Sequence, residues 1–157
     1  MVDLHSWNGC SETAISEIMT EPIVTIIVPG NPVPKGRPRF VLTGHVYSPE
    51  RTRTYERELA ILGSLEMGRT SPFEGPIKID VEAAFEVPKS WSAKKTSAAL
   101  TGVIHNISRL DIDNILKIVG DGLNQIVWKD DKQIVEARVI KKYGSTAYLK
   151  IQVWQVL

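Results

Sequence analysis

One stretch of alternating side chains limits the folds open to this chain more than any other feature. Apolar residues occupy every second position from Ile77 to Val87, and side chains two apart lie on the same face of a β-strand. The stretch therefore predicts a strand with one buried face. Three further segments are predicted to be strands, of which the first is rich in β-branched residues: Ile23–Val28, Gln133–Lys142 and Ala147–Gln155.

Two main helices are predicted between these strands. Ser48-Pro49-Glu50 is typical of a helix start, with a capping serine and a proline at the first helical position, and this helix is expected to end at Gly68. A second helix is expected to follow Asp113, which would cap it, and to end near Asn124. A hairpin of 40–42 with 45–47 and a short helix over 92–100 complete the predicted elements.

The order of these elements predicts an α+β or mixed α/β class. With 157 residues, the chain fits a single small domain, with a mixed β-sheet packed against about two main helices. Residues 1–21 are polar and loosely patterned, and we interpret them as an N-terminal extension. Residues 22–157 then form the domain.

Composition excludes several classes of protein. No window approaches the roughly 18 consecutive apolar residues of a membrane span, and the N-terminus does not resemble a secretion signal. The single cysteine, Cys10, rules out an internal disulfide framework and a cysteine-rich zinc site. The residues from Gly30 to Lys35 lack the glycine and hydroxyl pattern of a P-loop, so we expect no nucleotide cofactor. We expect a cytoplasmic protein.

Charge is unevenly distributed along a chain whose net charge is only +1. Residues 35–57 hold six basic and two acidic side chains, and aspartates gather later, at 111, 113, 121, 130 and 131. A metal-dependent phosphodiesterase needs such a division, because basic groups hold the polyanion and acids hold the cation. The basic residues expected to contact DNA are Lys35, Arg37, Arg39, Arg51, Arg53 and Arg57.

The most informative acids are Asp111 and Asp113. They lie on one face only if the chain stays extended through Asp113 and becomes helical there. Leu110 and Ile112 would then enter the core, and Lys117 would lie one helical turn above Asp113. With Asp130-Asp131 just before a strand, the sequence predicts three or four carboxylates near one helix N-terminus.

A divalent cation would relieve the repulsion among these carboxylates far better than the helix dipole, which contributes less than about 1 kcal/mol for each charge. Oxygen ligands without a Cys or His cluster favour Mg²⁺ or Mn²⁺ over zinc. An EF-hand is excluded because Leu116 occupies the position reserved for glycine. Each pattern alone also has an ordinary explanation, in helix capping or a polar turn.

The pattern Asp111-x-Asp113-Asn114-x-x-Lys117, followed by Asp121 and Asp130-Asp131-x-Gln133, strongly resembles the RusA Holliday junction resolvases of phages and prophages. The upstream residues 32–39 and 47–49, and the middle segment 87–92, resemble the same family. The resemblance covers roughly residues 23–155.

The resemblance implies a Mg²⁺-dependent homodimer, with Mn²⁺ as a possible substitute, that cuts two opposed strands of a four-way DNA junction. The implied essential residues are Asp111, Asp113, Asp131 and Lys117, with Asp130 as a weaker metal ligand. Some members have a basic residue directly before the first aspartate. Here Arg109 lies one residue earlier, and we include it among the expected DNA contacts.

Several alternatives stay open at this point. Lys117 could touch a phosphate oxygen, orient the attacking water, or form a salt bridge with Asp113 or Asp121. The chain could be a metal-dependent nuclease for other DNA structures. It could also be a DNA-binding recombination accessory protein without catalysis. An intact set of three aspartates and one lysine favours an enzyme.

Overall fold

The structure is a computed structural model that describes residues 21–36, 39–40, 46–47, 49–107 and 110–156. The predicted extension therefore lies almost wholly outside the described residues. In chain order the elements are β1 (Val24–Pro29), β2 (Arg39–Phe40), β3 (Val46–Tyr47), α1 (Glu50–Met67), β4 (Ile77–Glu86), α2 (Ala93–Leu100), α3 (Ile112–Leu123), a 3₁₀ turn η1 (Asp131–Gln133), β5 (Ile134–Gly144) and β6 (Tyr148–Gln155).

Four strands form one mixed sheet in the order β1-β6-β4-β5. β6 runs antiparallel to both β1 and β4, whereas β4 and β5 are parallel. The parallel pair needs a crossover, and the connection from β4 to β5 contains α2 and α3. β2 and β3 form a separate antiparallel pair.

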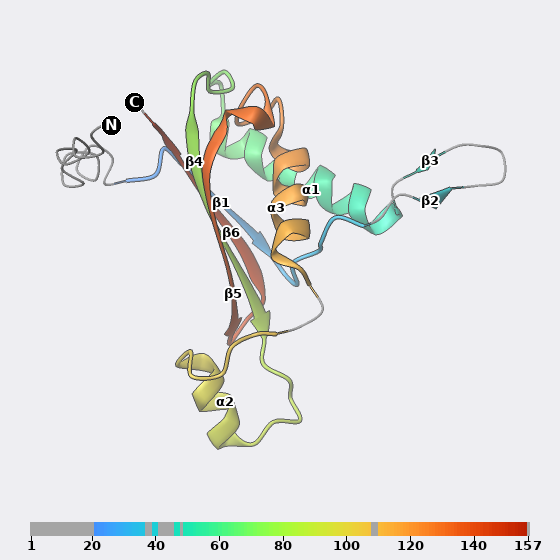
Figure 1. Cartoon of the computed structure of the whole chain (residues 1–157), viewed down its shortest axis with the longest axis vertical. Coiled ribbons are helices and arrows are strands. Elements are labelled where there is room, and N and C mark those ends of the chain that lie inside the picture. The colour runs from blue at the N-terminus through green and yellow to red at the C-terminus, as the bar shows by residue number, and fades with distance from the viewer. Residues whose placement is uncertain (1–20, 37–38, 41–45, 48, 108–109, 157) are drawn as a thin grey trace, which may run out of the picture.

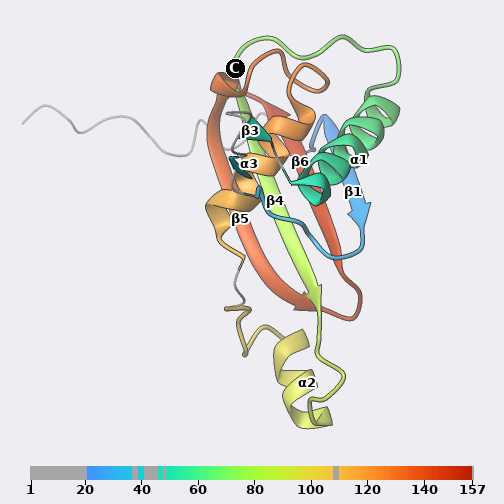
Figure 2. The same cartoon turned by 90° about the vertical axis from the view of Figure 1, so that its right-hand side faces the viewer.

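α1 and α3 pack side by side on one face of the sheet, and α2 lies beyond one end of it (Figure 1). The view at right angles shows both long helices on the same side of the strands (Figure 2). The close approach of the two helices depends on glycines. A Cβ on Gly122 would lie 2.9 Å from the Cβ of Leu59, and one on Gly63 would lie 2.8 Å from a methyl of Leu123.

The hydrophobic core lies between the sheet and these two helices. The alternating positions of β4 are buried as expected, with Ile77, Ile79 and Val81 at most 1% exposed. Burial on this scale is the main favourable contribution to folding. The helices and neighbouring strands complete the core with Leu59, Ile115, Ile118, Val119, Leu123, Trp128, Ile26, Val28, Leu149 and Ile151.

The opposite face of the sheet carries polar and charged side chains. Lys78 pairs with Glu136, and Lys142 pairs with Glu82, each at 3.0 Å. This one-sided burial explains the alternation along β4.

Among the described residues, no helix has both the length and the apolar character needed to cross a membrane.

The predicted fold class is confirmed: an α+β domain with a mixed sheet and two main helices against it. The predicted hairpin is present as β2 and β3, in which Phe40 pairs with Val46. Its turn lies outside the described residues. The assignment of residues 22–157 to one domain stays a prediction.

The boundaries expected next to two prolines were wrong by one residue. Pro29 ends β1 instead of interrupting it, which is possible because β1 is an edge strand and a proline there loses no ladder hydrogen bond. Pro49 has an extended ψ of 143° and occupies the N-cap of α1, so the first helical residue is Glu50. The expected capping residue Ser48 lies outside the described residues.

Candidate active site

α3 carries the predicted acidic site on its exposed side. Its apolar residues, including Ile115, Ile118 and Leu123, are fully buried. Asp113, Lys117 and Asp121 follow one another at intervals of four and are all exposed. Because residues four apart lie on the same side of a helix, the three form one polar stripe. Burial of the apolar face thus fixes the direction in which the charges point.

The expected start of this helix was wrong. Asp111 is the N-cap, with an extended backbone at φ −77° and ψ 141°, and Asp113 already lies in the first turn. The carbonyl of Asp111 accepts the first helical hydrogen bond, from the N–H of Ile115, so the helix begins two residues earlier than expected. Leu110 is half-buried against the core, but Ile112 is 48% exposed and does not enter it.

The Asp113 carboxylate is paired with Lys117. Lys117 Nζ donates to Asp113 Oδ2 at 3.0 Å, and both side chains are mostly exposed. The hydrogen bond from Lys117 is the main cause of a lowered pKa at Asp113, and backbone N–H groups in the first turn lower the pKa further. Asp113 is therefore ionised at neutral pH. At Asp111, the Asn114 side-chain amide donates to Oδ2 at 3.4 Å.

Asp130 and Gln133 form a capping box around η1. Asp130 Oδ1 accepts from the N–H of Lys132 at 3.0 Å, and Gln133 Oε1 accepts from the N–H of Asp130 at 2.8 Å. The Gln133 amide also donates to the carbonyls of Phe73 and Gly75. The Asp-Asp-x-Gln pattern thus has a structural role in which Asp130 caps the turn, and Asp131 beside it is exposed.

Asp131 and Lys117 both line a hollow of about 410 Å³ between α3 and the start of β5. Asp121 and Glu136 also line it. Glu136 borders the hollow, but its carboxylate pairs with Lys78 on the other face of the sheet, so we do not count it among the acids of the site. The lining is Leu116, Lys117, Gly120, Asp121, Asp131, Ile134, Val135, Glu136 and Ala137, so Asp111 and Asp113 lie outside this hollow.

The predicted metal ligands are not gathered into one cluster. Across the described residues, no three His, Cys, Asp or Glu side chains are close enough together to hold a metal ion. The chemistry of the donors nevertheless suits a hard cation, since Asp111, Asp113 and Asp131 are exposed carboxylates. The structure therefore supplies ligands of the right kind without bringing three of them together.

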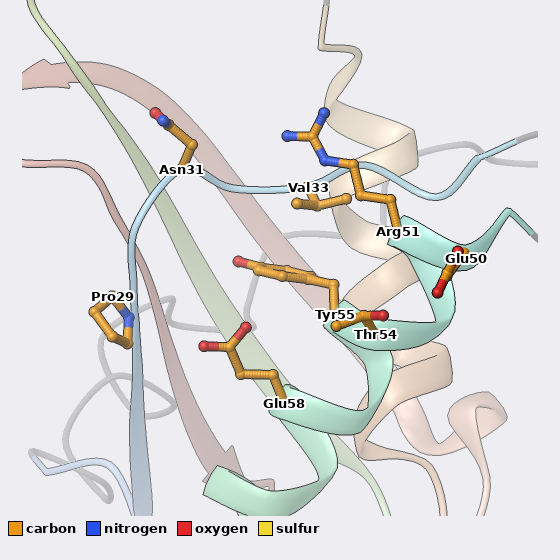
Figure 3. A pocket seen from close by; sticks show the side chains of 8 residues that line it. All are labelled: Pro29, Asn31, Val33, Glu50, Arg51, Thr54, Tyr55 and Glu58. Atoms are coloured by element: carbon orange, nitrogen blue, oxygen red, sulfur yellow. The ribbon is translucent and has the colours of Figure 1, made fainter.

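The predicted DNA-binding residues fall on different surfaces. Arg53 and Arg57 line a second hollow, between α1 and α3, and Asp121 belongs to both this hollow and the first. Arg51 lines a third hollow on the opposite flank of α1, beside Asn31 and Tyr55 (Figure 3). Arg37 and Arg109 lie outside the described residues, and only the backbone of Arg39, in β2, is described.

Lys35 differs from the other predicted contacts because both of its neighbours are acids. Its Nζ lies 2.5 Å from Glu56 Oε1 and 2.5 Å from Asp121 Oδ2. Burial alone would lower the pKa of Lys35, but the hydrogen bonds to Asp121 and Glu56 outweigh burial and raise it. Lys35 is therefore charged at neutral pH and already paired within the protein.

Fold and site together define a class: a small α+β domain in which exposed carboxylates and a lysine line one hollow, and arginines line a second hollow that shares Asp121 with the first. The sequence matches the family described as endodeoxyribonuclease RusA over residues 29–154, and the chain belongs to this family. Members of the family are endodeoxyribonucleases that act on branched DNA junctions. The resemblance seen in the aspartate and lysine pattern is confirmed.

A relative in Bacillus subtilis (strain 168), the uncharacterised protein YqaN, is 30% identical over 138 residues. The similarity covers 85% of this chain and 96% of the relative. The similarity thus extends over most of both chains.

Proposed function

We propose that this chain is a Mg²⁺-dependent endonuclease that resolves four-way DNA junctions through paired, symmetric incisions. One observation carries the proposal beyond family membership. Lys117 and Asp131, fourteen positions apart in the sequence, line the same hollow, and Asp121 joins this hollow to the one that carries Arg53 and Arg57. Two adjoining hollows, one with acids and a lysine and the other with arginines, suit a phosphodiester backbone.

We assign the metal to Asp111, Asp113 and Asp131, with Asp130 as a weaker candidate because its carboxylate caps η1. Held by these residues, Mg²⁺ would lower the pKa of a water and would neutralise charge that develops on the phosphate. Mn²⁺ would replace it, since both cations prefer oxygen ligands. Lys117 holds Asp113 in the structure, and in the proposed reaction it faces a phosphate oxygen or the attacking water.

The proposed enzyme acts as a homodimer. A four-way junction has approximate two-fold symmetry, and paired incisions need two active sites that face opposed strands. One chain supplies one set of Asp111, Asp113, Asp131 and Lys117, so two chains related by a two-fold axis meet the requirement. Sedimentation equilibrium is expected to give twice the mass of the chain.

Binding of junctions without catalysis is the second candidate function. The observation that favours it is the absence, among the described residues, of three carboxylates close enough to hold a metal ion. The same protein would then recognise branched DNA through Arg53 and Arg57 and leave cleavage to another enzyme.

Cleavage of a labelled synthetic four-way junction separates the two candidates. We expect paired symmetric nicks that require Mg²⁺, exceed those on linear duplex and flap controls, and are lost in Asp113→Asn. Glu66→Gln, which removes one exposed negative charge from α1, is the matched control and should cut normally. Binding without cleavage under Mg²⁺ or Mn²⁺ would establish the second function instead, and equal cleavage of every substrate would contradict junction resolution.

A further inference from the structure

The connection that follows β1 is fastened to both long helices. We call its residues Val33–Gly36 the strap, and it runs from the end of β1 past α3 to the start of α1 (Figure 1). The N–H of Lys35 donates to the carbonyl of Asn114, in the first turn of α3, at 2.9 Å. The N–H of Gly36 donates to Thr52 Oγ1 of α1 at 3.2 Å. Neighbouring residues of the strap thus bind different helices.

The path of the strap at Gly36 leaves no room for a side chain. A Cβ there would lie 2.7 Å from Thr52 Oγ1 and 2.9 Å from Pro49 Cγ, closer than atoms can approach without displacement. The backbone therefore lies directly on the first turn of α1.

The Lys35 side chain ties the strap to both helices a second time. Its Nζ contacts Glu56 on α1 and Asp121 on α3, and only 24% of the side chain is exposed. The three groups carry a net charge of −1, so they offer no attraction to a phosphate. A DNA phosphate could reach the ammonium only by displacing a carboxylate.

We propose that Lys35 is a positioning residue that fastens α1 to α3 and fixes Asp121 between the two hollows, and is not a DNA contact. This inference deepens the proposed function and rests on it. Without the ammonium, Asp121 and Glu56 repel each other across the junction of the two helices, the strap loosens, and the hollow between α1 and α3 loses its shape. The arginines and the carboxylates then lie in the wrong relation for cleavage.

The test compares Lys35→Met, which keeps length and loses charge, with Lys35→Arg, which keeps the charge. Lys94→Met, at an exposed position on α2, is the matched control for loss of one positive charge. In Lys35→Met we expect amide hydrogen exchange to accelerate at residues 35 and 36, whose N–H groups bind the two helices. We also expect the single-turnover cleavage rate to fall on the order of 10²-fold, as for a misplaced reacting group. The slope of log K for junction binding against log salt should stay unchanged. Lys35→Arg should restore both the exchange and the rate.

A DNA contact would give the reverse pattern. Junction binding by Lys35→Met would weaken, the salt slope would drop by about 1, and exchange in the strap would stay at the wild-type rate. That result would overturn the proposal.

Asp121→Asn provides an independent check. It should accelerate strap exchange as Lys35→Met does, and the double variant should exchange no faster than either single variant. Additive effects would show that the two residues act separately and would also overturn the proposal. If the wild-type chain cuts no junction, the proposed function is wrong. The rate of amide hydrogen exchange in the strap would still decide the role of Lys35.

Discussion

Asp113 and Lys117 form an ion pair whose role in stability can be separated from the role in cleavage that we propose for it. They form an exposed pair four residues apart on α3. Exposed pairs of this kind contribute little to stability because water already solvates both charges. If the pair served only to stabilise the helix, its loss would hardly change the free energy of unfolding or the activity. The pattern that first indicated this site is therefore better explained by the proposed reaction than by folding.

Substitution of Lys117 tests this interpretation at the scale of the residue. Lys117→Met should lower the single-turnover cleavage rate on a four-way junction by about 10²–10³-fold, the usual cost of removing one group that stabilises charge in the transition state. Its melting temperature should match that of the wild type within experimental error. A variant that melts normally and cuts normally would assign Lys117 to the surface ion pair alone. Lys94→Met serves again as the control for lost charge.

Among the elements, the open face of the sheet is held by a hydrogen bond between strands. Tyr148 on β6 donates its O–H to Glu82 Oε1 on β4 at 2.6 Å, and Lys142 on β5 pairs with the same carboxylate. Burial alone would raise the pKa of Glu82, but the hydrogen bonds from Tyr148 and Lys142 outweigh burial and lower it. The ionised form of Glu82 therefore stabilises the contact between three strands.

Removal of the Tyr148 hydroxyl should make the free energy of unfolding less dependent on pH in the acid range. Because the folded pKa of Glu82 is lowered, its contribution is present above the unfolded pKa of about 4.3 and is lost as pH falls through the folded value. Tyr148→Phe should cost about 1 kcal/mol in free energy of unfolding at pH 7, and the difference should shrink as the pH falls below about 4. Urea denaturation at several pH values measures this.

Tyr143→Phe, on β5, is the matched control for loss of a hydroxyl from the sheet. A deficit in Tyr148→Phe that stayed constant over the whole acid range in which the protein remains folded would contradict the role of the Glu82 charge. A deficit of equal size in both variants would contradict the specific hydrogen bond.

Across the whole molecule, α1 separates two surfaces that the sequence presents as one basic segment. Arg53 and Arg57 line the hollow that Asp121 shares with the carboxylate side, whereas Arg51 lines the hollow on the opposite flank. Residues two apart on a helix point in different directions, and packing of α1 against both β1 and α3 turns that difference into two separate faces.

The two flanks should therefore differ in DNA binding. Arg53→Ala and Arg57→Ala should each weaken junction binding and lower the salt slope by about 1, as expected for lost phosphate contacts. Arg51→Ala should have the smaller effect, because Arg51 lies on the other flank of α1 from the hollow that Arg53 and Arg57 line. Titration of a labelled junction at several salt concentrations, without divalent metal, measures all three. A larger loss for Arg51→Ala would place the DNA on the opposite flank.

Much of the site could be predicted from the sequence because spacing alone carries it. The four-residue intervals of Asp113, Lys117 and Asp121 predict one stripe on a helix, and the structure has that stripe. The start of the helix was missed, since Asp111 and Asp113 are both good capping residues and local preference does not choose between them. In the structure Leu110 is half-buried against the core and Ile112 is exposed, and the helix begins after Asp111.

The sequence by itself determined the class of fold, the exposed side of α3 and the family to which the chain belongs, because periodicity and motif spacing are local properties. Only the tertiary structure decided which charges meet. Lys35 and Asp121 are 86 positions apart and form an ion pair because the strap lies against both α1 and α3. Asp131 and Lys117 line the same hollow because the 3₁₀ turn brings the chain back beside α3 at the start of β5. Contacts between distant segments depend on how helices pack on the sheet, and no local pattern encodes that geometry.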